Sequence, residues 1–382
     1  MGQGKTICMV TVQHSAKDDR IYFKQAISLA KAGHQVHILS VSEDGHPKDM
    51  SGKSIKTDEN KGISFVTLQE PPRLLSKILK KSYLGPFYRR MIQAAISVRA
   101  DIYVAHEPQS IMIARKAAHG VSSHYLFDAH ESLYFSNWKD RWALKKEMNR
   151  LKAFTTANSL TQQALLKLNR GAVSEVIYNA SILERTPEPS AKELLIVHEG
   201  SFPFNRGLEL LMEALALLKK EAPLFNLKIV GSLSPAEENY FIHMVRTHQL
   251  EGRIALTGWV PYEDLGSQLS GSAIGLILNT PTPNNLYGGP ANKLFNYMAK
   301  SLMIISVDLP ETSRIIRTSG IGVVLDDRSP QTLASVLEKA LRDEDWRMSF
   351  RRSSAKAAEQ FSWDKESQKL MTFYDRVLEQ VA

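Results

Sequence analysis

Short apolar runs alternate with longer amphipathic segments along the whole chain. The short runs are rich in β-branched residues, and the longer segments carry apolar residues at helical spacing. Parallel strands that are buried on both faces form such continuous runs, and helices cross over between them. The pattern therefore predicts an α/β protein built on parallel sheets.

The first half of the chain is expected to form one such sheet. Predicted strands lie at residues 7–12, 35–41, 63–68, 102–106, 125–128 and 153–157, with a seventh at 176–178. The polar segment 186–190 then interrupts the alternation, and its prolines Pro187 and Pro189 disfavour both helix and strand. We expect this segment to link two domains.

The second half of the chain repeats the alternation. Predicted strands lie at residues 194–198, 227–230, 254–257, 274–278, 303–306 and 323–325. A final helix is predicted over 362–378, because Ser362 can cap its first N–H groups and Asp364 favours the helix dipole in the first turn. The predicted division is an N-terminal domain over 1–185, a C-terminal domain over 186–361 and a terminal helix within 362–382.

Composition supports two ordinary globular domains. The chain has 382 residues, of which 43% are apolar and 23% charged, and this length suits two cores of ~150 to 200 residues. No apolar stretch is long enough to span a bilayer, and the start of the sequence lacks a secretory pattern. The single cysteine, Cys8, cannot form an internal disulfide. We expect a cytoplasmic protein.

The net charge of +8 is concentrated in one stretch. Residues 71–100 hold seven basic side chains and no acidic one, interleaved with Leu, Ile, Tyr and Phe. Residues 73–99 therefore fit a basic amphipathic surface that contacts the anionic inner face of the cell membrane. They equally fit a helix pair whose apolar side packs on its own domain. No groove-reading motif indicates a nucleic-acid partner.

Two segments of the second half have the composition of anion-binding loops. The strand ending near residue 198 is followed by Gly200, Ser201 and Arg206, and a helix begins beyond them. A glycine lets the backbone approach a ligand, a helix start offers free N–H groups, and arginine forks onto phosphate. A plain turn explains the same residues.

The segment 284–299 is the second candidate loop. It holds Gly288, Gly289 and Pro290 in an unusual turn, and Asn292 and Lys293 begin a helix with an apolar body. Such a loop can present backbone N–H groups and a lysine to a diphosphate. The alternative is an ordinary glycine turn that caps a core helix.

Polar side chains also follow two strands of the first half. Asp128, His130 and Glu131 emerge at one strand end, and His106 and Glu107 emerge at the end of the strand before it. The carboxyl ends of parallel strands lie at one edge of a sheet, so we expect these groups to face one site. No His or Cys spacing indicates a zinc site, and no nucleophile elbow is present.

With these residues in place, the sequence resembles the retaining GT-B glycosyltransferases of the family 4 type, particularly bacterial members that build surface polysaccharides. The resemblance covers nearly the whole chain. It is carried by residues 19–36, 101–108, 128–131, 157–159 and 178–180, in that order, and by the two loops of the second half. It implies two Rossmann-like domains facing each other across a cleft, with the terminal helix crossing back to the N-terminal domain.

The resemblance also implies roles for individual residues. The catalytic group would be His130, which reaches toward the donor sugar, with Arg206 and Lys293 on the donor diphosphate. Donor binding would involve Gly200, Ser201, Val260, Gly288, Gly289, Pro290, Asn292, Leu294 and Asn296. The acceptor side would comprise His14, Asp19, Arg20, His106, Glu107, Asp128 and Glu131. The substrates would be a UDP- or GDP-linked sugar and a glycan or lipid-linked acceptor, with neither metal nor cofactor.

This chain departs from the family at the donor site. Two glutamates separated by seven residues are common there, and Gly288 and Asn296 stand at their positions. An amide offers one acceptor oxygen where a carboxylate accepts from both ribose hydroxyls. Two alternatives therefore stay open, a non-catalytic GT-B subunit that stabilises an active partner and a nucleotide-sugar 2-epimerase.

Overall fold

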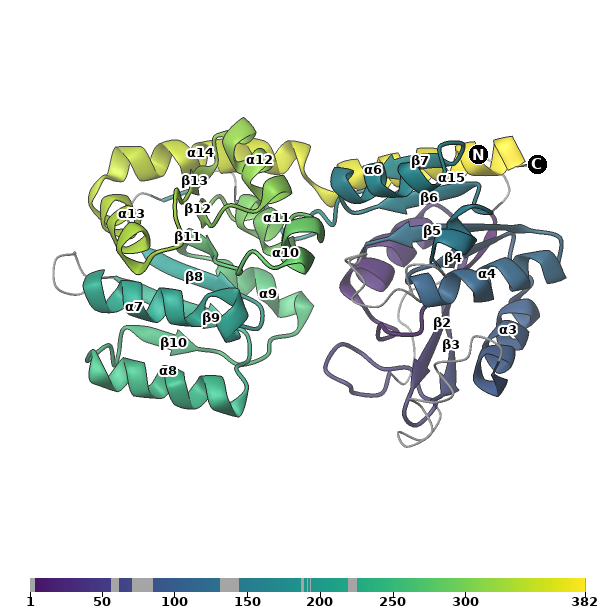
Figure 1. Ribbon diagram of the computed structural model, residues 1–382, viewed down its shortest axis with the longest axis horizontal. Helices are drawn as coiled ribbons and strands as arrows, with labels where there is room; N and C mark the ends of the chain where they lie inside the picture. Colours follow the sequence, from purple (N-terminus) through teal and green to yellow (C-terminus); the bar gives the residue numbers. More distant parts are fainter. Residues whose placement is uncertain are drawn as a thin grey trace. The chain divides into compact units, whose positions relative to one another are not determined.

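The computed structural model describes residues 4–55, 62–70, 85–130, 144–186, 189–190, 192, 194–218 and 225–381. The chain divides into two compact units. Unit 1 comprises Met1–Asn179 together with Glu366–Ala382, and unit 2 comprises Ala180–Lys365. The chain therefore passes into unit 2 before the predicted linker 186–190, and its C-terminal segment belongs to unit 1 (Figure 1).

Unit 1 is built on a parallel sheet. Its strands are β1 (Thr6–Val10), β2 (Gln35–Ser42), β3 (Ile63–Gln69), β4 (Ile102–Ala105), β5 (His124–Ala129), β6 (Ala153–Thr156) and β7 (Val173–Val176), in the order β3-β2-β1-β4-β5-β6-β7. The connecting helices are the π-helical η1 (Asp19–Ala26), α1 (Ile27–Lys31), α3 (Pro86–Val98), α4 (Pro108–Gly120) and α6 (Ser159–Leu168), and α15 (Trp363–Val381) ends the chain.

Unit 2 repeats this architecture. Its strands are β8 (Leu195–Glu199), β9 (Asn226–Val230), β10 (Ile254–Leu256), β11 (Ser272–Ile277), β12 (Met303–Ser306) and β13 (Gly322–Val324), in the order β10-β9-β8-β11-β12-β13. Its helices are η2 (Phe204–Arg206), α7 (Leu208–Leu218), α8 (Pro235–Thr247), α9 (Tyr262–Leu269), α10 (Pro283–Tyr287), α11 (Asn292–Ala299), α12 (Pro310–Ser319), α13 (Pro330–Arg342) and α14 (Glu344–Gln360).

The predicted strands are confirmed to within about two residues at each end, with one exception. The seventh strand was predicted at 176–178 and lies instead at Val173–Val176. The reason is a long-range contact: the Tyr178 N–H donates to the Glu366 carboxylate at 2.9 Å, so this residue contacts the C-terminal helix and not a neighbouring strand. The predicted final helix is confirmed as α15.

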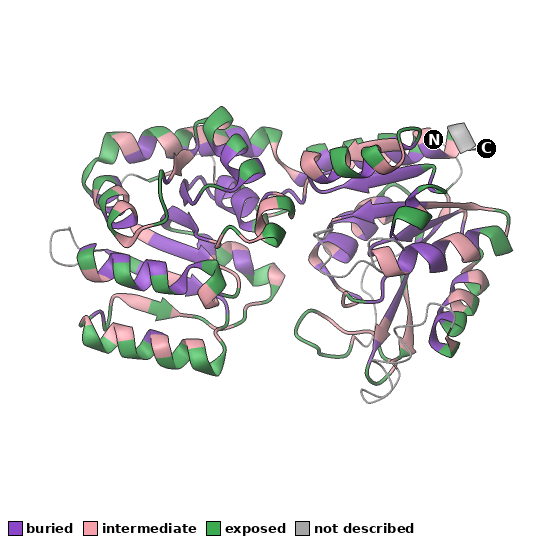
Figure 2. Ribbon diagram, viewed as in Figure 1, coloured by how far each residue is buried: buried purple, intermediate pink, exposed green. Residues whose placement is uncertain are grey.

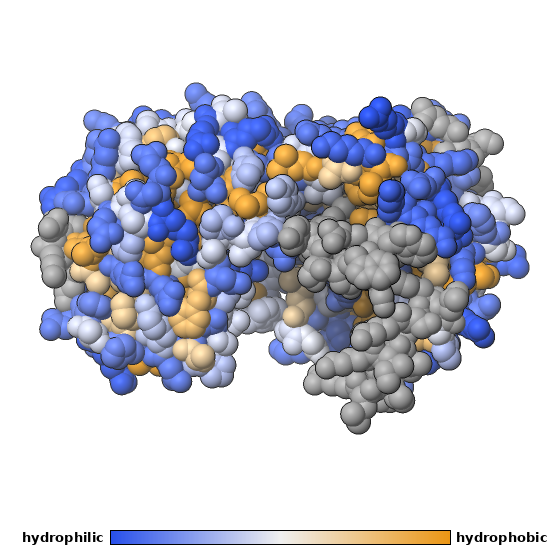
Figure 3. Space-filling view, viewed as in Figure 1, coloured by the Kyte–Doolittle hydropathy of each residue, from blue (hydrophilic) through white to orange (hydrophobic). Residues whose placement is uncertain are grey.

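Burial follows the apolar pattern within each unit. Figure 2 shows buried strands at the centre of each sheet and exposed outer faces on helices such as α8. The face of the molecule drawn in Figure 3 is correspondingly hydrophilic over much of its area. Among the described residues, no helix combines the length and apolar character needed to cross a membrane.

The described part of the basic stretch packs on its own unit. In α3, Phe87 and Tyr88 are 4% and 2% exposed and belong to the core of unit 1, whereas Arg89 and Arg90 are exposed. For this helix the packing interpretation is the correct one, because its aromatic side chains are not available to a membrane. Residues 71–84 lie outside the described residues, as does Glu131.

Gly275 of β11 determines how closely helix α11 packs on the sheet of unit 2. The Tyr297 ring of α11 lies directly against Gly275 of β11, where any Cβ would collide with it. This close approach lets α11 pack on the sheet with Lys293 through Ala299 buried. Polar residues at its start are thereby carried into the interior of unit 2.

Candidate functional sites

Asp128 is the centre of a buried polar cluster at the carboxyl end of β5 in unit 1. Its two oxygens accept from Arg20 Nε and Nη2 at 2.9 and 2.7 Å, from Gln25 at 2.8 Å and from Thr155 at 2.6 Å. Burial raises the pKa of Asp128, but the Arg20 charge and these hydrogen bonds outweigh it, so that the pKa lies well below its ordinary value. The carboxylate is therefore ionised and fixed in place.

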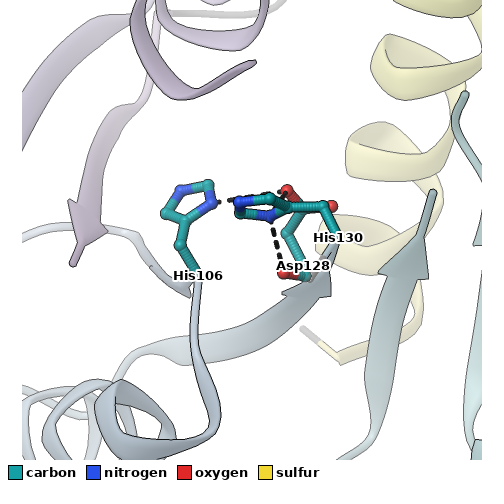
Figure 4. Close-up of side chains that lie close together, drawn as sticks. All are labelled: His106, Asp128 and His130. Carbon is teal, nitrogen blue, oxygen red and sulfur yellow. Dashed lines mark hydrogen bonds and ion pairs between the residues drawn. The ribbon is translucent and has the colours of Figure 1, made fainter. Parts of the chain in front are cut away.

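Two histidines lie against this carboxylate (Figure 4). His130 Nδ1 is 3.1 Å from Asp128 Oδ2, and His106 Nδ1 is 3.3 Å from the same oxygen. The His106 and His130 ring centroids are 5.6 Å apart, and His14 lies 5.1 Å from His130 on another side. Burial lowers the pKa of His106, which keeps that imidazole neutral. The predicted convergence of His106, Asp128 and His130 is thus observed.

His106, Asp128 and His130 also form a candidate metal site by their spacing. Each offers a ligand atom, and these atoms lie within 4.8 Å of one another. However, Asp128 already forms a bidentate ion pair with Arg20 and accepts from Gln25 and Thr155. A divalent cation bound here would be repelled by the positive charge of Arg20, whose side chain is 1% exposed and therefore not screened by solvent. These three residues therefore fit a metal poorly.

The loop between β1 and η1 is held by carboxylates. Glu107, 1% exposed, accepts from the Thr11 hydroxyl, from Val12 N at 3.2 Å and from Gln13 N at 3.3 Å. His14 Nδ1 lies 3.3 Å from Asp18, which caps η1. Burial raises the pKa of Asp18, and the contacts with His14 more than reverse this, leaving the pKa below its ordinary value.

Asp18 was not among the predicted site residues. Its signal was available, because an aspartate just before a helix commonly caps it. The predicted Asp19 accepts from Asn179 at 3.3 Å and lies 3.7 Å from Lys24, at the edge of the cluster. The predicted Arg20 donates hydrogen bonds to Asp128 from Nε and Nη2, and to the Ile177 carbonyl from Nη1 at 3.0 Å. Its role within unit 1 is therefore to hold Asp128.

Unit 2 contains a second cluster, at the carboxyl end of β8. Lys293 Nζ lies 3.0 Å from His198 Nε2, and the two residues are 7% and 0% exposed. Burial, together with a smaller effect of the Arg206 charge, lowers the pKa of Lys293 to about 7 against the opposing effect of Glu199. Burial and the Lys293 charge hold the pKa of His198 well below its ordinary value. The predicted site residue Lys293 therefore lies in contact with His198, a residue that was not predicted.

A carboxylate borders this pair. Glu199 Oε1 accepts from the Asn296 amide at 2.9 Å, and the Glu199 N–H donates to the Tyr297 hydroxyl at 2.9 Å. Sequence reasoning missed both His198 and Glu199. The signal was present, since His198-Glu199 repeats at the end of β8 the order of His106-Glu107 at the end of β4. A polar pair at the carboxyl end of a buried strand is the pattern that had marked the first cluster.

The loop after β8 places Arg206 near these groups. Gly200 has a φ of 87°, and Arg206 Nη1 donates to the Ser201 hydroxyl at 2.9 Å. Gly207 follows with a φ of 98°, and a Cβ there would lie 2.5 Å from Leu278 Cβ after β11. The glycine therefore allows the β8 and β11 loops to meet, which the bond from Thr280 N to Asn205 O at 2.9 Å also shows.

The remaining predicted donor residues lie on two loops of unit 2. Gly288 ends α10, and Gly289 has a φ of 90°, which favours glycine. Pro290 is buried, Asn292 begins α11 with its side chain exposed, and Leu294 is buried in the core. Val260 follows β10 and is half-buried. Leu294 and Pro290 therefore support the loops from the interior, while Val260, Gly288, Gly289 and Asn292 lie at or near the surface.

Two family models match the chain, one on each half. A family model described as Glycosyl transferases group 1 matches residues 182–360, and one described as Glycosyltransferase Family 4 matches residues 23–185. The chain belongs to the glycosyltransferases. A curated relative, the D-inositol 3-phosphate glycosyltransferase of Jonesia denitrificans, is 26% identical over 186 residues. That match covers 48% of this chain and 43% of the relative, so the chain spans less than half of the relative's length.

Solved structures share the fold of this glycosyltransferase. Anabaena Alr3699/HepE in complex with UDP and glucose has a TM-score of 0.74 at 15% identity, covering 97% of this chain and 100% of that chain. The sucrose-phosphate synthase of Thermosynechococcus elongatus has a TM-score of 0.75 at 14% identity, covering 98% and 100%. The two units are therefore the two Rossmann-like domains of the GT-B fold, as the sequence predicted.

Proposed function

We propose that this glycosyltransferase moves a sugar from a UDP- or GDP-linked donor to a glycan or lipid-linked acceptor, with retention of configuration and without a metal, in bacterial surface-polysaccharide synthesis. The observation that carries the proposal is the group of basic side chains Lys293, His198 and Arg206 at the carboxyl end of β8. Ligands of open α/β sheets bind at this edge. A diphosphate leaving group needs positive charge there as the glycosidic bond breaks.

Glu199, which borders this group, offers a carboxylate where the family glutamates are missing. Asn296 donates its amide to Glu199, so a carboxylate lies within hydrogen-bond distance of the position where the second glutamate is expected. A glutamate at 296 would instead face Glu199 and place two negative charges together. Glu199 can therefore accept from the donor ribose in place of the missing residue, which favours an active transferase over a degenerate copy.

Unit 1 is proposed to bind the acceptor. His14, His106 and His130 form a group of imidazoles held by Asp18 and Asp128. An imidazole can form a hydrogen bond with a sugar hydroxyl through either ring nitrogen. In a retaining mechanism a donor phosphate oxygen takes the acceptor proton, so His130 would orient a substrate hydroxyl and need not act as a nucleophile.

Calorimetric titration of UDP, GDP, ADP and their sugar conjugates, without added metal, tests the donor site. We expect one base to bind selectively and Arg206→Ala to weaken it by about tenfold or more, because a hydrogen bond to a charged group contributes about 1.5–3 kcal/mol. Arg246→Ala is the matched control, since Arg246 is an exposed arginine of the same unit, on α8. It should bind like the unmodified protein.

The outcomes separate the alternatives. Binding followed by sugar transfer to an acceptor supports the proposal. Conversion of the nucleotide sugar alone into its epimer would identify a 2-epimerase. If no nucleotide binds at millimolar concentration, the protein is a non-catalytic subunit and the proposal is wrong. A lipid-linked acceptor, with the exposed Arg89 and Arg90 of the basic stretch toward the membrane, predicts binding to anionic vesicles at low salt, and absence of that binding counts against it.

A further inference from the structure

We infer that His198 is a positioning residue that holds the Lys293 side chain by sharing a proton with it, so that the donor diphosphate binds with uptake of one proton by this pair. The inference rests on the proposed nucleotide-sugar site, and it describes how the charge of that site changes when the donor binds. It is carried by a contact between two basic side chains in the interior of one unit.

The contact is geometrically fixed. Lys293 Nζ and His198 Nε2 are 3.0 Å apart, and the His198 ring stacks on the buried Phe202 with centroids 3.7 Å apart and planes at 27°. Lys293 is carried into this position by α11, whose packing depends on the close approach of Tyr297 to Gly275.

Two bases in contact cannot both be charged in such a place. An ammonium can donate to a neutral imidazole, or an imidazole N–H can donate to a neutral amine, and either arrangement satisfies the 3.0 Å contact. Desolvation penalises every charge at this depth. Burial lowers the pKa of Lys293 to about 7 and that of His198 well below its ordinary value. Near neutral pH the pair therefore carries on average less than one positive charge.

The surrounding groups determine the sign of the response. Glu199 on β8 favours the charged lysine, and Arg206 on η2 opposes it. On α11 itself, burial raises the pKa of Tyr297, which stays neutral. Strands β11 and β12 contain no titratable side chain, and Arg351 of α14 is bonded to the carbonyls of Ser301, Ser190 and Ser272.

A diphosphate changes this balance. Its negative charge stabilises the ammonium, so a proton moves from solvent to Lys293 Nζ when the donor binds, and no other bond forms or breaks. Above the pKa of the free pair, each bound donor takes up close to one proton, and affinity falls up to tenfold per pH unit. Well below that pKa the lysine is already charged, and uptake approaches zero.

Calorimetry of UDP-glucose binding in buffers of different ionisation enthalpy measures this uptake directly. UDP-glucose is the better probe than UDP, because its diphosphate is esterified at both ends and does not itself titrate near neutral pH. We expect uptake to rise from near zero at about pH 6 toward one proton at about pH 8 to 9. GDP-glucose is the second arm if the site selects guanine.

His198→Gln separates positioning from structure. The glutamine amide can accept from the ammonium but cannot take the proton from it, so the lysine should lose its proton at a lower pH than in the unmodified protein. Proton uptake at about pH 6 should therefore rise above that of the unmodified protein, while uptake at about pH 8 should stay near one. His243→Gln, at an exposed histidine of α8, is the matched control and should show the uptake of the unmodified protein.

Each outcome is decisive. Binding without uptake between about pH 6 and pH 9, or equal uptake at about pH 6 by His198→Gln and the unmodified protein, overturns the inference and leaves the proposed function standing. Absence of binding by any nucleotide sugar overturns both. If His198→Gln fails to fold, the buffer series on the unmodified protein still tests the inference, because it requires no variant.

Discussion

Replacing Asp128 by alanine should destabilise unit 1 more than any surface change. The substitution removes the acceptor of two of the three Arg20 hydrogen bonds described above and leaves that guanidinium, 1% exposed, with the Ile177 carbonyl. Breaking a buried ion pair by removing one partner typically costs about 3–5 kcal/mol, because an uncompensated charge stays buried. Gln25 and Thr155 lose their acceptor as well. We therefore expect a loss of about 3–5 kcal/mol in the free energy of unfolding.

Cys8 provides a probe of unit 1 alone. It is the single cysteine of the chain and lies 0% exposed in β1. Burial raises the pKa of its thiol, so it should react with a thiol reagent only when unit 1 opens. Pulsed labelling across a urea series then gives the unfolding curve of this unit without assuming that the whole two-domain protein unfolds in one step.

A double-mutant cycle tests the cause. Arg20→Met removes the charge, so the double variant Arg20→Met/Asp128→Ala should be more stable than the sum of the two single effects predicts, by at least about 1 kcal/mol. The exposed pair Glu175 and Arg376, 3.5 Å apart with 39% and 40% exposure, is the control. Glu175→Ala should cost about 0–1 kcal/mol. An Asp128→Ala cost in that same range, or strict additivity in the cycle, would refute the reasoning.

Two further predictions concern unit 2. In urea unfolding, Gly207→Ala should destabilise this unit more than Gly252→Ala. Both glycines have a positive φ, but only at position 207 would a Cβ collide with Leu278, and overpacking of this kind costs about 1–3 kcal/mol. Equal losses of unfolding free energy in the two variants would contradict this explanation. The stability of unit 2 should rise with pH between about 7 and 10.5, because unfolded Lys293 binds a proton there that the folded side chain has lost, and the slope reaches about 1.4 kcal/mol per pH unit. Lys293→Met should remove this rise in urea titrations at several pH values, and an unchanged slope would show that other groups cause it.

Much of the fold follows from the apolar pattern, for a physical reason. Strands buried on both faces are apolar throughout, and the first polar residue marks where each strand leaves the core. This rule located His106, Asp128 and His130 at strand ends, and it would have located His198 and Glu199 had it been applied to β8. The misplaced β7 shows its limit, since the Tyr178 backbone pairs with a side chain 188 residues away.

The pairing of site residues could not be predicted in the same way. Lys293 meets His198 across 95 residues of sequence, and Arg20 meets Asp128 across 108. The first contact depends on a glycine in β11 that lets a tyrosine approach the sheet. Neither spacing nor composition encodes that approach, so the lysine was assigned to phosphate without the histidine that lies against it.

The return of the C-terminal segment to unit 1 determines how the protein can be dissected. A fragment ending at Asn179 would lack Glu366 and the buried side chains of Leu370, Phe373 and Tyr374, so it would expose apolar surface that the native unit covers. Because the Tyr178 N–H contacts the Glu366 carboxylate, the two ends of unit 1 lie close together. A chain in which residues 1–179 continue through a short linker into 366–382 would therefore keep the native contacts, whereas cutting the sequence at a single boundary would not.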